Sequence, residues 1–475
     1  MDSALLGPAA SNGGAGTGST AARSRSFDAT ADVDRGRNEG GLALQLAFLG
    51  MATLGFNRTR VAGLAVSDLL FMACGLVVVI KLLAGDTRDL AAPSARRTSS
   101  LVLVGAVLLL TFGTLSSLRS WDPLGSMQVV LRFGWLTLVW FWILRLAARN
   151  RSALYRLLSG WRIAILVSAF LAVIGQLGLW SGGLYEGENR QMAFFFHPNE
   201  LASLLVFGLP LIVFDVPRRP GKEASTLRRV ALTGFVAWAV MATGSMTAFF
   251  TAIVGLTVGA IAIPLTRGRY RIRRHTGFVS VGLGTLAVVG LFFASNSELP
   301  VFQRFTRFEQ GDSGIENSIE ARAEWNQAVI DHLDETLFVG VGLQLQSGPL
   351  GNVVRIGQGE SAPGAIEGVH NMFLKLLHEA GVPALIGLFI VILATLRQTW
   401  RTAICSRGTD LYPVAIALLA AIISSNAMAQ FGPIAYQRYY WAPIAMATCL
   451  WSIRRQELRE EQAAQLDAPQ PDLAR

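Results

Sequence analysis

The sequence is a succession of apolar segments, each close to the ~20 residues that an α-helix needs to cross the ~30 Å hydrocarbon layer of a membrane. Short polar stretches that contain arginine separate most of these segments. Of the 475 residues, 52% are hydrophobic and only 15% are charged, whereas soluble domains are about 25% charged. We therefore predict an all-α polytopic membrane protein rather than a string of soluble domains.

About twelve membrane-spanning helices fit the apolar segments. Residues 1–40 are rich in Ala, Gly, Ser and Thr, and we predict a disordered cytoplasmic tail there. Spans one to nine should occupy 41–295, a long polar loop 296–369, spans ten to twelve 370–453, and a second cytoplasmic tail 454–475. The predicted spans are 41–56, 61–83, 100–118, 126–147, 162–180, 197–215, 229–243, 246–265, 276–295, 370–396, 411–430 and 434–453.

The distribution of arginine predicts the orientation of the chain. With the N-terminus in the cytoplasm, the inside loops hold most arginines, for example in 267–274, and the short outside turns hold few. Both termini are then cytoplasmic, the protein lies in the cytoplasmic (inner) membrane, and loop 296–369 faces outward. The formal net charge of +9 is read as this topology signal. Because the arginines are scattered between apolar segments, they do not indicate nucleic-acid binding.

The predicted outer loop is strongly acidic, with four arginines against eleven acidic residues, a formal charge of −7. Arginines kept in so acidic a loop indicate binding of an anion more than topology. A long polar loop in a membrane protein is also where chemistry on a water-soluble group is expected. The arginines are Arg304, Arg307, Arg322 and Arg355.

A helix is predicted inside this loop, from Ser318 to about Leu333, because Asn317 can cap its start. Arg322 and Trp325 would share one side of that helix. A guanidinium can hold two phosphate oxygens at once, which a lysine cannot. The alternative for Arg322 is an ordinary ion pair with a neighbouring glutamate. The run 338–342 should end the helix in a turn.

His370 should begin the tenth span at the outer membrane boundary. Asn371, Lys375 and His378 follow it on adjoining positions of one helix face. Ionisable residues inside a span are costly and by default suggest function. An imidazole can accept a proton from a sugar hydroxyl at neutral pH. The alternative is an interfacial histidine that is satisfied by water and a backbone carbonyl.

A second polar helix start is predicted at His197 and Asn199, with Pro198 in the favoured first-turn position. An outward helix N-terminus attracts an anion, and the alternative is a polar cap without a ligand. No paired-cysteine, D-x-D or H-E-x-x-H pattern predicts a metal site. We expect neither a metal nor a cofactor.

Several of these elements resemble the O-antigen ligase family of membrane glycan transferases. The run 196–202, with its His-Pro-Asn-Glu-Leu-Ala sequence, is similar to one family element. Arg322-Ala323-Glu324-Trp325, Gly340-Val341-Gly342 and the run 370–374 look like the family's outer loop and following helix. The resemblance extends from about Arg190 to Gly381, and about twelve spans with one late outer loop fit the remainder.

The resemblance implies a glycosyltransferase of surface polysaccharide biosynthesis. The family takes a glycan from an undecaprenyl-pyrophosphate carrier and joins it to the hydroxyl of a glycan or lipid-glycan acceptor. It needs no metal and inverts the anomeric centre. His370 would be the base and Arg322 would hold the leaving diphosphate. Further diphosphate ligands would be Arg190, Arg304 and Arg307, and the supporting residues would be His197, Asn199, Asn371, Trp325 and Lys375.

One position departs from the family. A Ser-Arg pair usually follows the seventh span, whereas here Ser245 is followed by Met246. A phosphate ligand is therefore missing, or Arg190 or a loop arginine supplies it. Two other functions stay open. One is a transporter or flippase of lipid-linked sugars, which would predict matched repeats with broken helices. The other is a non-catalytic relative that binds polyprenyl phosphates.

Overall fold

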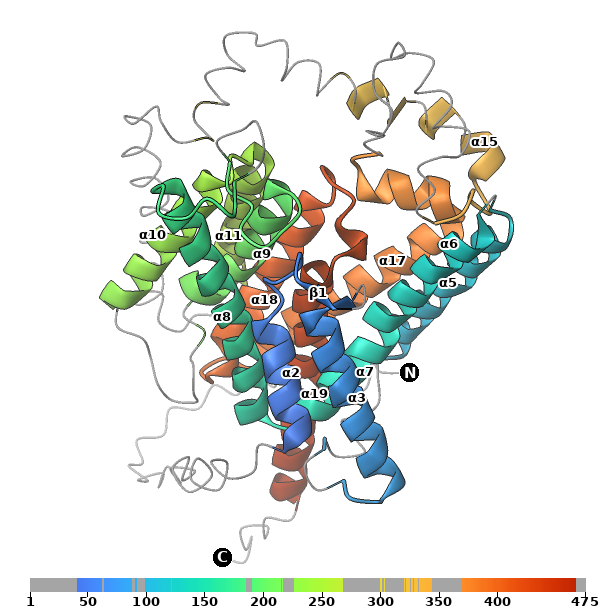
Figure 1. Cartoon of the computed structure of the whole chain (residues 1–475). Helices are drawn as coiled ribbons and strands as arrows, with labels where there is room; N and C mark the ends of the chain where they lie inside the picture. The colour runs from blue at the N-terminus through green and yellow to red at the C-terminus, as the bar shows by residue number, and fades with distance from the viewer. Residues whose placement is uncertain are drawn as a thin grey trace, which may run out of the picture. The chain divides into compact units, whose positions relative to one another are not determined.

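The computed structural model describes most of the apolar part of the chain, and all described residues belong to one compact unit, 40–475. They form a helical bundle (Figure 1). The described residues are 41–61, 64–87, 90–91, 99–120, 122–184, 190–214, 216, 226–267, 300, 303, 320, 322–324, 326–327, 329–331, 333–343 and 369–466.

The described elements are almost all helices. One antiparallel hairpin, with two residues in each strand, precedes α3. Helix α6 continues into α7 through one π-helical turn. The first elements are α2 (Leu42–Ala52), β1 (Arg60–Val61), β2 (Leu64–Ala65), α3 (Val66–Leu83), α5 (Ser100–Leu118), α6 (Pro123–Gly134), η2 (Trp135–Val139), α7 (Trp140–Ala147) and α8 (Arg151–Gln176). Then follow α9 (Pro198–Val213), α10 (Thr226–Ala242), α11 (Met246–Arg267), α15 (Leu333–Thr336), α17 (Met372–Cys405), α18 (Leu411–Met428), η3 (Ile434–Tyr436) and α19 (Arg438–Leu466).

Among the described residues, seven helical stretches are long and apolar enough to cross a membrane, and α2 and α9 are shorter apolar helices. The chain is therefore an all-α integral membrane protein of the polytopic kind. The prediction of about twelve spans is not confirmed. The predicted span 276–295 and most of the predicted loop 296–369 lie outside the described residues.

Several helices are longer than their predicted spans. Helix α8 begins at Arg151, well before the predicted start at 162, because the Asn150 side chain caps it by accepting the Ala153 N–H at 2.9 Å. Helix α17 continues to Cys405 and α19 to Leu466. The predictions followed apolar length alone, and these helices continue as polar turns beyond their apolar part. By contrast, α5 has the predicted bounds of 100–118.

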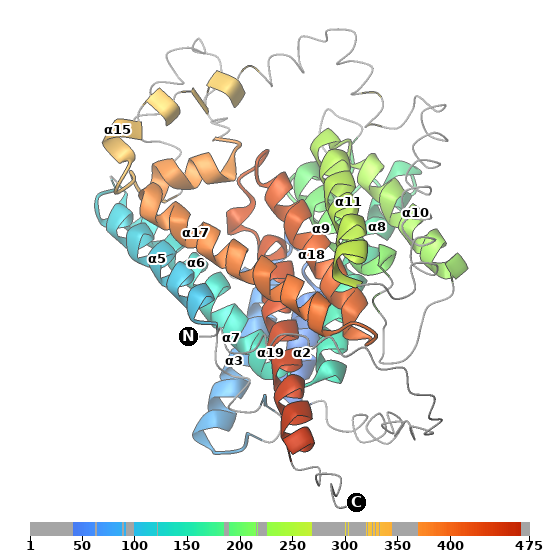
Figure 2. The same cartoon turned by 180° about the vertical axis from the view of Figure 1, so that it is seen from behind.

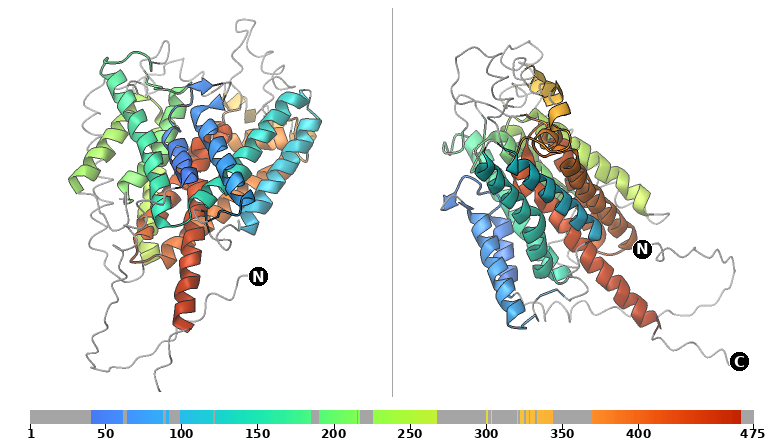
Figure 3. Two further views of the ribbon diagram at one scale, coloured as in Figure 1. Left: turned by 60° about the horizontal axis from the view of Figure 1, so that its bottom comes forward. Right: turned by 90° about the vertical axis from the view of Figure 1, so that its right-hand side faces the viewer.

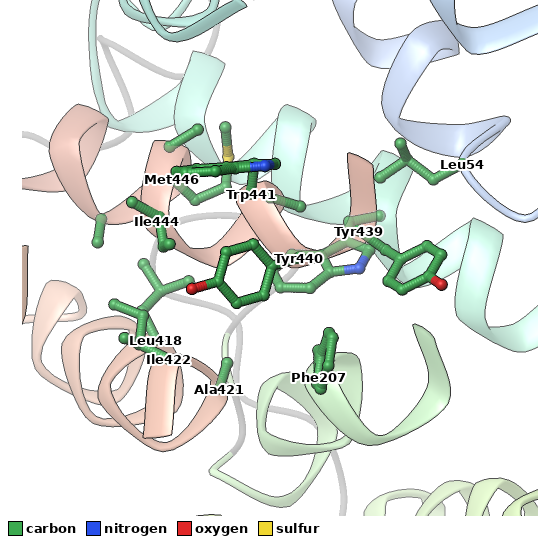
Figure 4. Close-up of a cluster of buried hydrophobic side chains, with 14 of the residues drawn as sticks. Leu54, Phe207, Leu418, Ala421, Ile422, Tyr439, Tyr440, Trp441, Ile444 and Met446 are labelled. Atoms are coloured by element: carbon green, nitrogen blue, oxygen red, sulfur yellow. The ribbon is translucent and has the colours of Figure 1, made fainter. Parts of the chain in front are cut away.

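The core of the bundle is formed by α18 and the first half of α19. Tyr440 and Ile444 of α19 are buried beside Leu418 and Ile422 of α18, as Figure 4 shows. Trp441 packs instead on Phe133 of α6 and Phe141 of α7. Phe207 of α9 packs on Tyr439, with ring centroids 6.1 Å apart. Because α18 and α19 are covered by other helices, side chains near the start of α19 can reach several neighbours.

Helices α5 and α17 pack closely through two glycines. A Cβ on Gly387 would lie 2.6 Å from the carbonyl oxygen of Gly105, and a Cβ on Gly105 would lie 2.6 Å from that of Gly387. Small residues let helix backbones approach in this way, which gains van der Waals contact where lipid supplies no hydrophobic driving force. The pair therefore fixes α17 against α5 (Figure 2).

Gly387→Ala is expected to destabilise the protein by about 1–3 kcal/mol, because the new methyl group overpacks against backbone. Gly234 in α10 offers a matched control, since a Cβ there meets nothing within 4 Å. Gly234→Ala should be neutral or stabilising, as expected when alanine replaces a helical glycine. Thermal unfolding in detergent would compare the two variants. A Gly387→Ala protein as stable as Gly234→Ala would contradict the close packing.

The two ends of the bundle carry separate polar networks. At one end, Arg151 pairs with Asp410 at 2.7 Å and with Glu457, and Arg454 pairs with Glu461 at 2.7 Å. The start of α8, the start of α18 and the second half of α19 therefore meet there, and α19 projects at this end (Figure 3). The sequence predicts that their arginine-rich flanks lie on one side of a membrane, and that side stays a prediction.

The other end is called the His370 end below. Helices α3, α9, α17 and α19 begin there, as contacts at or next to their first residues show, and Arg190 joins the turn before α11 to the start of α9. Arg438 pairs with Asp68, the Gln437 side chain bonds Glu200 at 2.9 Å, and the Met372 N–H bonds the Ala429 carbonyl at 2.8 Å. This end holds the predicted site residues that the structure describes.

Candidate active site at the His370 end

Asn371 starts helix α17. Its side-chain oxygen accepts the N–H groups of Phe373 and Leu374 at 3.0 and 3.1 Å, so it is the N-cap. Its amide nitrogen donates to Gln430 at 3.1 Å, which joins the helix start to the end of α18. His370 directly precedes the cap and is half-buried. The prediction of His370 at a helix start is confirmed, although the helix begins at Met372 rather than at the histidine.

Helix α17 is broken at Gly381, which the sequence analysis did not predict. Gly381 has φ = 83°, in the left-handed region that favours glycine. A short helix, 372–380, therefore precedes the long part of α17, and the two parts differ in direction (Figure 2). His370 is presented by this short helix and not by a continuous membrane span.

The segment 337–342 of the acidic loop covers the break and satisfies its backbone. The N–H groups of Val341 and Gly342 donate to the carbonyls of His378 and Glu379 at 3.2 and 2.9 Å, and the Val382 N–H donates to Leu337 at 2.7 Å. A break in a membrane helix is tolerated where protein re-satisfies the freed groups. The predicted turn at 338–342 is confirmed, and it anchors the loop directly on the short helix.

The short helix carries a buried ion pair, which a tyrosine from the connection before α19 contacts. Lys375 and Glu379 are 6% and 3% exposed, and their charged groups are 3.5 Å apart. The Tyr436 hydroxyl donates to the other carboxylate oxygen of Glu379, and the Lys375 ammonium lies 5.6 Å from the Tyr436 ring centroid. Buried charges persist when they are paired and hydrogen-bonded. Lys375 is thus held by Glu379 and Tyr436, while its predicted supporting role stays a prediction.

His197 and Asn199 form the start of α9 as predicted. The His197 ring nitrogen Nδ1 accepts the Asn199 N–H at 3.1 Å, and Pro198 is the first helical residue. Arg190 is 4% exposed, and its guanidinium donates to the Asn199 side chain at 3.0 Å and to the Thr243 carbonyl at 2.8 Å. A buried cation therefore lies at a helix N-terminus, a place that favours anions.

Arg190 also lies at the turn between α10 and α11. A Cβ on Gly244 would be 3.0 Å from the Cγ of Arg190, and Met246 begins α11 two residues later. The turn that carries an arginine in the resembled family is therefore the turn that Arg190 contacts. This contact was not visible in the sequence, because Arg190 and Thr243 are 53 residues apart.

The loop residues are only partly described. Arg322 lies in a helical stretch and is half-buried, and described residues from Glu320 to Thr336 are helical. The described part of the predicted helix is therefore helical and continues to Thr336, past the predicted end at about Leu333, while its predicted start at Ser318 lies outside the described residues. Arg304, Arg307 and Trp325 lie outside the described residues, so their roles stay predictions. Within the part of the chain that is described, no three His, Cys, Asp or Glu side chains gather as metal ligands.

Four charged or aromatic residues of this end were not among the predicted site residues, and neither were the amide side chains of Asn57 and Gln437 that contact them. Glu200 accepts from Asn57 at 3.2 Å and from Gln437 at 2.9 Å, and Arg438 pairs with Asp68. One signal was present, because Asp68 is an acidic residue within the predicted span 61–83, and a charge there by default suggests function. Tyr436 is the fourth, and nothing in its local sequence marks it.

A comparison with protein families finds a match that includes part of the His370 end. The family model described as O-antigen ligase matches residues 231–389. The match includes most of α10, then α11, Arg322, His370, the short helix and its break, whereas Arg190 and the start of α9 precede it. The comparison with curated proteins finds no match. Over residues 231–389, the chain is thus similar to the O-antigen ligase family.

Proposed function

We propose that the chain transfers or polymerises a glycan from an undecaprenyl-pyrophosphate carrier onto an acceptor hydroxyl on the outer side of the cytoplasmic membrane. The observation that carries this proposal is the placement of His370. It lies beside the cap of a short helix that the acidic loop covers, within the stretch that is similar to the O-antigen ligase family. A base at the water-facing edge of a membrane bundle is suited to an acceptor hydroxyl and a lipid-bound donor.

The chemistry follows from charge. His370 takes the proton from the acceptor hydroxyl, whose oxygen attacks the anomeric carbon as the carbon–oxygen bond to the diphosphate breaks. The leaving diphosphate gains negative charge, and fixed cations that are already in place stabilise it best. Arg190 at the α9 start and Arg322 in the loop supply these cations, with Arg304 and Arg307 as further candidates. Attack from the face opposite the diphosphate inverts the anomeric centre.

A broken helix such as α17 also occurs in transporters, which are the alternative function. Transporters built from inverted repeats break helices in matched positions, near the bilayer midplane. Among the helices for which backbone angles are described, α17 has its break close to its start, next to the polar loop. The groups freed by this break bond the loop backbone rather than remaining available to a substrate. This arrangement favours an enzyme.

The test is transfer by the purified full-length protein in liposomes. The donor is a polyprenyl-diphosphate-linked oligosaccharide, and the acceptors are a second copy of that donor and a set of lipid glycans. We expect elongated or ligated glycan together with free polyprenyl diphosphate, unchanged by chelator. If product also forms without the protein, or if no acceptor gives product in its presence, the proposal is contradicted. Full activity of Arg322→Ala would remove Arg322 from the site.

A further inference from the structure

Three consecutive residues, from the end of η3 to the first residue of α19, each contact a carboxylate of a different helix. We call them the 436–438 bridge. The Tyr436 hydroxyl and the Gln437 amide are hydrogen-bond donors, and Arg438 forms an ion pair. Their partners lie in α17, α9 and α3, respectively. The contacts are Tyr436 with Glu379, Gln437 with Glu200, and Arg438 with Asp68.

Two of the bridge contacts hold a buried carboxylate and the Gln437–Glu200 contact is half-buried, so none is an ordinary surface pair. Glu379 is 3% exposed and Asp68 is 7% exposed. Burying a carboxylate is costly unless charge and hydrogen bonds compensate. Each of these two has a cation beside it, Lys375 for Glu379 and Arg438 for Asp68. The bridge therefore holds its partners in defined positions, because a displaced carboxylate would lose its compensation.

The first two bridge contacts belong to the two halves of the proposed site. Glu379 lies in the short helix that presents His370, and Glu200 lies in the first turn of α9, next to Asn199 and Arg190. Tyr436 and Gln437 are adjacent, so their Cα atoms are about 3.8 Å apart. One peptide unit thus connects the helix of the base to the helix start that binds the diphosphate.

We propose that the 436–438 bridge is the positioning element that sets the separation between His370 and the diphosphate-binding start of α9. This inference rests on the proposed function. Transfer requires the base and the diphosphate to lie on opposite sides of one sugar carbon, and a misplacement of about 1 Å can cost about 100-fold in rate. The bridge residues act through Glu379 and Glu200 and need not touch substrate themselves.

Tyr440 provides a matched control for Tyr436. It is a buried tyrosine four residues further along the chain, in α19, and its hydroxyl donates to the Asn426 side chain of α18 at 3.1 Å. Replacing either tyrosine with phenylalanine removes one buried hydroxyl and leaves the ring. Only Tyr436 contacts the His370 helix, so a general effect of losing a buried hydrogen bond should appear equally in both variants.

The kinetic test compares Tyr436→Phe, Gln437→Leu and Tyr440→Phe as full-length protein in liposomes. Tyr436→Phe and Gln437→Leu should lower kcat by about tenfold, with KM for the donor nearly unchanged, because positioning acts on the reacting geometry. Tyr440→Phe should resemble the wild type. A fall in kcat shared equally by Tyr440→Phe, or wild-type kcat in both bridge variants, overturns the inference.

A second measurement does not depend on activity. Phe196 and Phe338 are 46% and 73% exposed at the two halves of the site. Cysteines at these positions, in a background without the three native cysteines, can carry nitroxide spin labels for a pulsed distance measurement. Tyr436→Phe and Gln437→Leu should broaden the distance distribution, and Tyr440→Phe should leave it as narrow as in the parent.

The two measurements separate the failure of the inference from the failure of the proposed function. If the parent protein transfers no glycan, the proposed function fails, and the distance distribution alone decides whether the bridge positions the two helices. If transfer occurs and the bridge variants change neither kcat nor the distribution, the bridge is not a positioning element. Broadening with unchanged kcat also overturns the inference, because the positioning would then not serve transfer.

Discussion

His370→Ala is expected to lower the rate of glycan transfer by about 10³-fold, within the range that a positioned general base contributes. The imidazole would remove the acceptor proton during attack, and alanine cannot. The affinity for the donor should change little, because the proposed diphosphate ligands are arginines elsewhere. The measurement is single-turnover transfer with saturating lipid-linked donor, which separates chemistry from binding and product release.

Asn371→Ala is the control for His370→Ala. The N-cap of the short helix is the Asn371 side chain, so its loss should cost about 1 kcal/mol of stability. His370→Ala keeps that cap and should unfold at nearly the wild-type temperature. If His370→Ala transfers glycan slowly but unfolds near the wild-type temperature, the loss lies in the chemical step and not in folding. Transfer at more than half the wild-type rate would show that His370 is not the base.

The bundle could be predicted from the sequence where local rules decide. The starts of α5, α11 and α18 fall on the first residues of predicted spans at 100, 246 and 411, because polar residues or a turn precede each apolar run. The break at Gly381 was not predicted. A glycine followed by Val-Pro is compatible with a kinked or a continuous helix. Whether the helix breaks there is determined by segment 337–342, which contacts it from a distant part of the sequence.

For the site as well, local features could be predicted from the sequence and long-range contacts could not. The helix start at His197 was predicted, because caps follow from residues one or two positions away. Asn371 was expected on a face inside the helix and is instead its N-cap. The position of Arg190 at the α10–α11 turn was not predictable, since that contact joins distant parts of the chain. The 436–438 bridge depends on three helices meeting at one connection. The hydrophobic pattern of 434–453 does not carry that information. Only Asp68, an acidic residue within a predicted span, indicated a polar contact at this place.

Arg190→Lys is expected to lower kcat/KM for the lipid-linked donor by about 100-fold, because a lysine lacks the planar fork that binds two oxygens. Arg190 is buried against Asn199 and the Thr243 carbonyl, so lost packing has to be controlled. Arg162 is the matched control. It is 8% exposed and donates to the Leu211 and Val216 carbonyls at the other end of α9. Arg162→Lys should leave kcat/KM per folded protein essentially unchanged.

Met246 allows a sharper version of this test. Arg190 packs on Gly244 in the turn where the resembled family has its arginine, and Met246 starts α11 just beyond that turn. If one cation at this turn is what the diphosphate needs, Met246→Arg should restore part of the activity lost in Arg190→Ala. Restoration by Met246→Arg but not by Met246→Gln would identify the charge as the cause. If Arg190→Ala keeps full activity, or if Met246→Gln rescues as well, Arg190 does not bind the leaving diphosphate.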